Sequence, residues 1–194
     1  MNETLLIFLS AGLVNNLILD HMLGVDSVIA LSRKPETALD LTLLMLILLP
    51  ITTACGWLLA TSMLQPMRLE YLLLPAQVLL ICLLVPAAGM ILQRVRPQLF
   101  TRLVLYFPLV MVNCTILGVT LLNLSALHNL SASIAYGFGS AACFGLVMLL
   151  TSAIRDRISA ADVPIPFKGT AILFITLGLM AMAFMGFTGL SPVQ

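Results

Sequence analysis

Long apolar runs alternate with short polar segments along the whole chain. A helix that spans a membrane needs about 20 mostly apolar residues, and six runs in this chain reach that length. They cover approximately residues 4–31, 38–63, 71–92, 103–122, 131–154 and 169–190. This pattern predicts an all-α polytopic membrane protein with six transmembrane helices, no soluble domain and no long linker.

Polar and proline-bearing segments separate the runs and also interrupt two of them. Arg33-Lys34-Pro35-Glu36 closes the first run, because proline disfavours helical geometry at the preceding residue. That run is too long for one plain helix, and Asn15 and Asn16 lie inside it. The fourth run contains Pro108, four residues before Val112. We therefore expect the first and fourth helices to be broken near mid-membrane, where irregular backbone must be buried in protein or line a cavity.

The two interrupted runs carry similar short elements 98 residues apart. Val14-Asn15-Asn16-Leu17-Ile18-Leu19 and Val112-Asn113-Cys114-Thr115-Ile116-Leu117 share Val, Asn, Ile and Leu in register. The same shift superimposes the second and third runs on the fifth and sixth. Each half, about 1–97 and 98–194, then has three helices, so the second half enters the membrane from the opposite face. We expect a single membrane domain built as an inverted repeat, with its working site on the two broken helices.

Composition supports the membrane assignment and excludes one class of partner. Hydrophobic residues make up 61% of the chain and charged residues 9%, against roughly 25% charged in soluble domains. The formal net charge is +1 and no basic stripe is present, which argues against nucleic-acid binding. The start, Met1-Asn2-Glu3-Thr4, lacks the basic region of a signal peptide, so we expect the first run to be retained.

The distribution of lysine and arginine predicts the orientation. Segments that follow the first, third and fifth runs contain eight of the nine basic residues: Arg33, Lys34, Arg94, Arg96, Arg102, Arg155, Arg157 and Lys168. The opposite side has only Arg68. Because basic loops stay in the cytoplasm, both termini are expected on the periplasmic side.

The amides and the thiol in the broken runs each allow two interpretations. Asn15, Asn16 and Asn113 either satisfy backbone groups freed by a helix break or contribute to a site. Cys114, next to the expected break, is either a packing residue or a thiolate ligand. The remaining cysteines are expected to be small apolar packing residues: Cys55, Cys82 and Cys143.

Asp20, His21 and Asp26 form the ionisable cluster of the first run. Ionisable groups within a membrane are costly and suggest a functional site. If the first run is a half-helix followed by a loop, however, the same residues lie at the membrane interface. Both interpretations remain open from spacing alone.

Several longer motifs resemble one family of membrane subunits. They are Leu13-Val14-Asn15-Asn16, Ser32-Arg33-Lys34-Pro35-Glu36-Thr37-Ala38, Tyr136-Gly137-Phe138-Gly139, the segment 161–169 and the segment 183–190. With these motifs the chain resembles the A-type membrane subunits of the Rnf complex, also called Rsx. This family is related to membrane subunits of the sodium-pumping NADH:quinone reductase. The resemblance covers essentially all 194 residues.

The resemblance implies a function that spacing does not reveal. Rnf complexes move electrons between ferredoxin and NAD, coupled to Na⁺ or H⁺ transport across the bacterial inner membrane. The expected partners are Rnf subunits B, C, D, E and G, with the E-type chain closest, besides the membrane lipid. The A-type and E-type chains are expected to share a [2Fe–2S] cluster bound by cysteines from broken helices. Flavin and nicotinamide are expected on other subunits, so this chain has no complete active site.

The chain departs from the family at one of the two cysteine positions. Cys114 matches the family cysteine that follows asparagine, but Asp26 stands where family members commonly have a cysteine before proline. Asp26 therefore supplies a carboxylate ligand, or the ligand set differs, or the cluster is absent. The last possibility favours a structural scaffold without a redox role. Inverted repeats also build secondary transporters, which is a further alternative.

Overall fold

The computed structural model describes residue 19 and residues 21–104, 107–126 and 129–186. Throughout these ranges the regular secondary structure is helical. The α-helices are α3 (Val25–Leu31), α4 (Pro35–Leu59), α5 (Leu73–Val95), α6 (Pro97–Leu103), α7 (Phe107–Met111), α8 (Cys114–Ala126), α9 (Leu130–Ser159) and α10 (Thr170–Met185). Shorter turns of helix are the π-helix η2 (Ala60–Leu64) and the 3₁₀-helices η3 (Glu70–Leu72) and η5 (Ile165–Phe167).

Four helical segments in the described part of the chain are long and apolar enough to cross a membrane: Pro35–Leu64, Leu73–Val95, Phe107–Ser125 and Leu130–Ser159. A fifth, Thr170–Met185, is apolar but shorter. These five segments coincide with the second to sixth runs, and the prediction of an all-α membrane protein is confirmed. Most of the first run lies outside the described residues.

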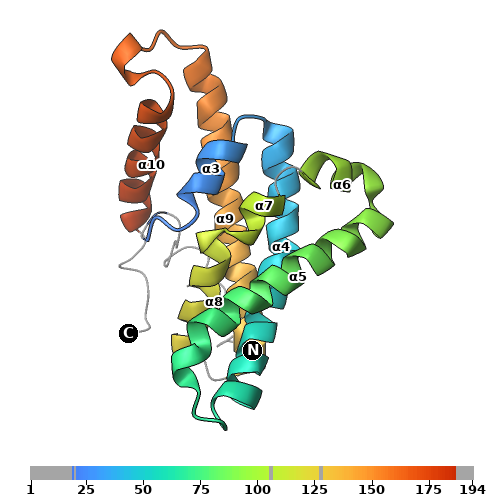
Figure 1. Cartoon of the computed structure of the whole chain (residues 1–194). Helices are drawn as coiled ribbons and strands as arrows, with labels where there is room; N and C mark the ends of the chain where they lie inside the picture. Colours follow the sequence, from blue (N-terminus) through green and yellow to red (C-terminus); the bar gives the residue numbers. More distant parts are fainter. Residues whose placement is uncertain (1–18, 20, 105–106, 127–128, 187–194) are drawn as a thin grey trace.

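Helices α4 and α9 form the centre of the bundle and run in opposite directions (Figure 1). Glycines on α9 allow their close approach. A Cβ atom added to Gly137 would lie 2.7 Å from the Cα atom of Pro50 and would also contact Thr53. Small residues at such crossings let helices pack in a membrane, where no hydrophobic force drives them together. Between α4 and α9 the core is filled by large side chains, including Leu41, Met45, Leu49, Phe144 and Met148.

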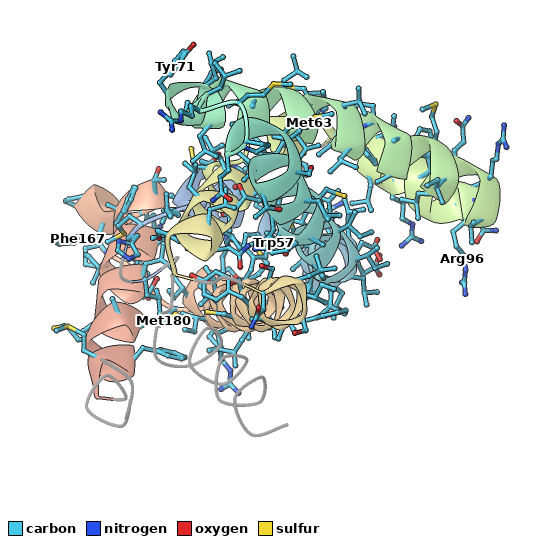
Figure 2. All side chains as sticks on the ribbon, turned by 90° about the horizontal axis from the view of Figure 1, so that it is seen from below. Trp57, Met63, Tyr71, Arg96, Phe167 and Met180 are labelled. Atoms are coloured by element: carbon cyan, nitrogen blue, oxygen red, sulfur yellow. The ribbon has the colours of Figure 1, made fainter. Side chains whose placement is uncertain are left out.

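The outer helices expose apolar side chains. On α5, the large apolar side chains of Leu79 and Leu83 are 69% and 66% exposed. Figure 2 shows α5 along one edge of the bundle, with Tyr71 and Arg96 near its two ends. Helix α10, which contains Met180 and follows Phe167, lies at another edge. Such surfaces suit contact with lipid or with another membrane protein, because lipid acyl chains and apolar protein surfaces are both as apolar as leucine.

Candidate site at two helix breaks

A break interrupts the fourth apolar run, as predicted. Helix α7 ends at Met111 and helix α8 begins at Cys114. Asn113, which is 2% exposed, lies directly before α8. Its side-chain Oδ1 accepts a hydrogen bond of 2.9 Å from the backbone N–H of Thr115. Asparagine is a preferred residue at this position because it satisfies a donor that the helix start leaves free. Asn113 thus satisfies a backbone donor that the helix break leaves free.

A second helix start lies against this break. Helix α3 begins at Val25, and the preceding residue, Gly24, has a φ of 81°. Only glycine adopts this left-handed conformation readily. A Cβ atom at Gly24 would also overlap with Thr115 Oγ1 and lie 3.2 Å from Asn113 Oδ1. Both the backbone conformation and the close contact therefore require glycine here.

Side-chain hydrogen bonds join the two helix starts. Asn113 Nδ2 donates to Ser27 Oγ over 3.0 Å, between two buried residues. Thr115 Oγ1 donates to the carbonyl oxygen of Leu23 over 3.3 Å. The side chain of Leu23 packs on Gly118, where an added Cβ atom would lie 2.5 Å from Leu23 Cδ1. Segments about 90 residues apart are thus fixed against each other, and Figure 1 shows α3, α7 and the start of α8 gathered beside α9.

The two predicted ligand residues occupy the first turns of these helices. Cys114 is the first residue of α8, and its side chain is exposed. Asp26 is the second residue of α3 and is also exposed. Each is the sequence neighbour of a residue in the Asn113–Ser27 hydrogen bond. A carboxylate in the first turn of a helix interacts favourably with the free backbone N–H groups there, and Asp26 occupies such a position. Stabilisation of the start of α3 would by itself explain an aspartate at position 26, without a bound metal.

Within the described residues, the two helix starts offer too few donor atoms for a complete iron–sulfur site. Such clusters are usually held by four cysteine thiolates. Among the described residues no group of three or more His, Cys, Asp or Glu side chains is placed to hold a metal ion. Cys114 and Asp26 together would make up half of a ligand set, which fits a site shared with a second chain.

The other cysteines lie within the long helices and not at either helix start. Cys143 is buried on α9 and Cys55 is partly buried on α4, as expected of packing residues. Cys82 is exposed on α5 and therefore does not pack in the core of this chain.

The C-terminal end of α3 is held by Arg155, which the sequence indicated only as one of the basic residues that follow an apolar run. Arg155, on α9, donates from Nη1 to the carbonyl oxygen of Ile29 over 3.0 Å and to Ser32 Oγ over 3.1 Å. A basic group that binds the last carbonyls of a helix stabilises its C-terminus. The only sequence signal for this role was an arginine at the end of an apolar run.

The contact between the two helix starts is separate from the 98-residue repeat, which matches Asn113 with Asn15 as equivalent positions in the two halves. In the structure, Asn113 lies against Gly24 and Ser27. Asn15, Asn16 and Asp20 lie outside the described residues. His21 is exposed, four residues before the start of α3.

Comparison with known proteins identifies the family. The model of the Rnf-Nqr family, described as "Rnf-Nqr subunit, membrane protein", matches residues 4–191. A protein of Aliivibrio salmonicida, named as the A component of an ion-translocating oxidoreductase complex, is 44% identical over 190 residues, which cover 98% of each chain. Proteins with the same name from Yersinia enterocolitica and Vibrio parahaemolyticus are 43% and 42% identical, each over 98% of this chain and 98% or 99% of their own length. The family expected from the sequence motifs is thereby confirmed: the chain belongs to the Rnf-Nqr family of membrane subunits.

Proposed function

We propose that this chain is the A-type membrane component of an ion-translocating oxidoreductase complex of the Rnf type in a bacterial inner membrane. The complex would transfer electrons between ferredoxin and NAD and couple this transfer to the transport of Na⁺ or H⁺. The proposal is supported by relatives that bear this component's name and match 98% of the chain at 42–44% identity. Rnf subunits B, C, D, E and G are the partners we propose, with the E-type chain in direct contact.

The role we propose within the complex is to contribute ligands to a [2Fe–2S] cluster shared with the E-type chain. The observation that supports it most directly is the hydrogen-bonded pair of helix starts, which exposes Cys114 and Asp26 on neighbouring segments. A bound [2Fe–2S] cluster supplies one-electron transfer. Soft thiolate is the usual ligand of iron–sulfur clusters, and the carboxylate of Asp26 would be an unusual one.

The residues of this chain would position those ligands. Asn113 fixes the start of α8 and, through Ser27, the start of α3. Gly24 allows the two starts to meet without a side chain between them. Arg155 holds the other end of α3. Ligand side chains on helices that are fixed in this way need little rearrangement, which is the general requirement for a precise metal site.

We further propose that the chain is one membrane domain of six spans, arranged as two inverted halves. The directions of the helices support this arrangement. In Figure 1, α3, α4 and α5 run alternately upward, downward and upward, whereas α8, α9 and α10 run downward, upward and downward. Each half thus has a shorter helix, α3 or α8, and two longer helices that follow it.

Both termini are proposed to lie on the periplasmic side. Contacts support the grouping of the basic segments at one end of the bundle. Arg102, after the third run, forms an ion pair of 3.4 Å with Glu36, after the first run. Arg155, at the end of the fifth run, bonds to Ile29 and Ser32. Figure 1 places the segment around Arg68 at the opposite end. The positive-inside rule then assigns the basic end to the cytoplasm.

Deletion of the E-type chain tests the shared cluster. We expect the [2Fe–2S] electron paramagnetic resonance (EPR) signal to disappear while this chain remains inserted in the membrane, because one thiolate and one carboxylate cannot hold the cluster. A signal that persists when this chain is expressed alone would exclude the shared site. If the signal is absent from the complete complex as well, a structural scaffold role is favoured. In that case Asp26 would serve only to stabilise the first turn of α3.

A further inference from the structure

A cavity of about 380 Å³ lies between the end of α9 and the start of α10. Its lining includes two basic residues, Arg155 and Lys168, and four aliphatic residues, Ile158, Val163, Ile172 and Leu173. The cavity is distinct from the helix starts at Gly24 and Asn113, none of whose residues line it. It lies at the end of the bundle that carries most of the basic residues, where the helices leave the apolar part of the membrane.

The charge in the cavity is suited to an anion. Arg155 uses only Nη1 for its two hydrogen bonds to the end of α3. A guanidinium has five N–H donors, and within the described residues Nε and Nη2 form no hydrogen bond. Lys168 is exposed, and Arg33 directly follows Ser32, which Arg155 contacts. A phosphate bound here would pair with both cavity cations.

Acidic residues do not cancel this charge within the cavity. Asp156 and Asp162 are near in sequence, but both are exposed and neither belongs to the cavity lining.

The apolar lining distinguishes a lipid from a soluble anion. Leu173 is buried, Ile158, Val163 and Ile172 are half-buried, and together they form an aliphatic wall next to the two cations. A soluble phosphate gains nothing from such a wall. A phospholipid gains from both parts, because its phosphate pairs with the cations and its acyl chains cover the aliphatic side chains. Basic pockets between membrane helices on the cytoplasmic side suit anionic headgroups.

We propose that this cavity binds an anionic phospholipid, with the headgroup phosphate on Arg155 and Lys168 and an acyl chain against Ile172 and Leu173. Because Arg155 also holds the end of α3, the lipid would stabilise the position of this helix. Lipid binding requires only the cavity and its charges. It is therefore independent of whether the chain carries a cluster.

Photo-cross-linking in the purified complete complex tests this proposal. The probe is a phosphatidylglycerol with a photoreactive acyl chain, and mass spectrometry counts the cross-links within residues 155–173. We expect labelling in the wild type and a reduction of about fivefold in Lys168→Gln, since one Lys near an anionic lipid contributes roughly 1 kcal/mol. Lys168 is exposed, so its substitution leaves folding intact. Arg155→Gln should reduce labelling as well.

The matched control is Arg157→Gln, which removes an exposed arginine from the same helix outside the cavity and should leave labelling unchanged. Equal labelling by a phosphatidylethanolamine probe would overturn the proposal, because that headgroup has no net charge. Unchanged labelling in Lys168→Gln would also overturn it. Displacement of the probe by millimolar inorganic phosphate, as effective as displacement by unlabelled phosphatidylglycerol, would show a soluble-anion site instead.

Discussion

Asn113 Nδ2 donates a hydrogen bond to Ser27 Oγ over 3.0 Å, and this bond joins two helix starts that are 86 residues apart in sequence. The same Asn113 side chain caps α8 through Thr115. One amide therefore sets both the beginning of α8 and its position relative to α3. The proposed ligands are the sequence neighbours of the two bonded residues: Cys114 follows Asn113, and Asp26 precedes Ser27.

Removal of the Asn113 side-chain amide should destabilise both the start of α8 and its contact with the start of α3. Asn113→Ala should cost about 1 kcal/mol for the lost cap and roughly 1–3 kcal/mol more for the unpaired Ser27 hydroxyl. The measurement is the fraction of this protein that remains in the complex after heating. Ser27→Ala and the double variant complete a thermodynamic cycle. If the two single effects simply add, the hydrogen bond does not couple the helix starts.

Gly24→Ala should be more damaging than its size suggests. The added methyl group requires a left-handed alanine and overlaps with Thr115, which together cost at least about 2 kcal/mol. Assembly of the protein into the complex should fall accordingly. Gly178→Ala is the matched control, since nothing lies within 4 Å of a Cβ atom at this position on α10. Similar losses for both variants would contradict the close contact at Gly24.

The sequence predicted the parts of this fold that depend on local composition. Apolar runs long enough to span a membrane located α4, α5, α9 and α10, and the polar Asn113 within such a run located the break before α8. The contact between the breaks was not predictable in the same way. It depends on Gly24 fitting against Thr115 and on Ser27 facing Asn113, and a hydrogen bond across 86 residues leaves no periodic signal.

The membrane orientation can be tested with reporter fusions. A periplasm-active alkaline phosphatase fused after Gln194 should be active, and the same enzyme fused after Arg96 should be inactive, because the basic segments stay in the cytoplasm. The reverse pattern would contradict both the orientation and the assigned sides of the two halves.

Substitution of Asp26 separates a ligand from a helix-stabilising carboxylate. If Asp26 binds iron, Asp26→Cys should keep the cluster and change its EPR spectrum and midpoint potential, because ligand type controls both. Asp26→Ala should then weaken or remove the signal. If the carboxylate only stabilises the start of α3, Asp26→Ala should cost about 0.3–1 kcal/mol of stability. A wild-type spectrum in Asp26→Ala would rule out ligation.

The most direct test of the proposed role is the EPR spectrum of the purified complex with Cys114→Ser. Serine is close to cysteine in volume, and Cys114 is exposed, so the fold should be retained while a soft thiolate ligand is lost. Cys82→Ser is the matched control, because Cys82 is also exposed but lies within the long helix α5 and not at either helix start. The account predicts that the [2Fe–2S] signal disappears in Cys114→Ser and persists in Cys82→Ser. An unchanged signal in Cys114→Ser would contradict it.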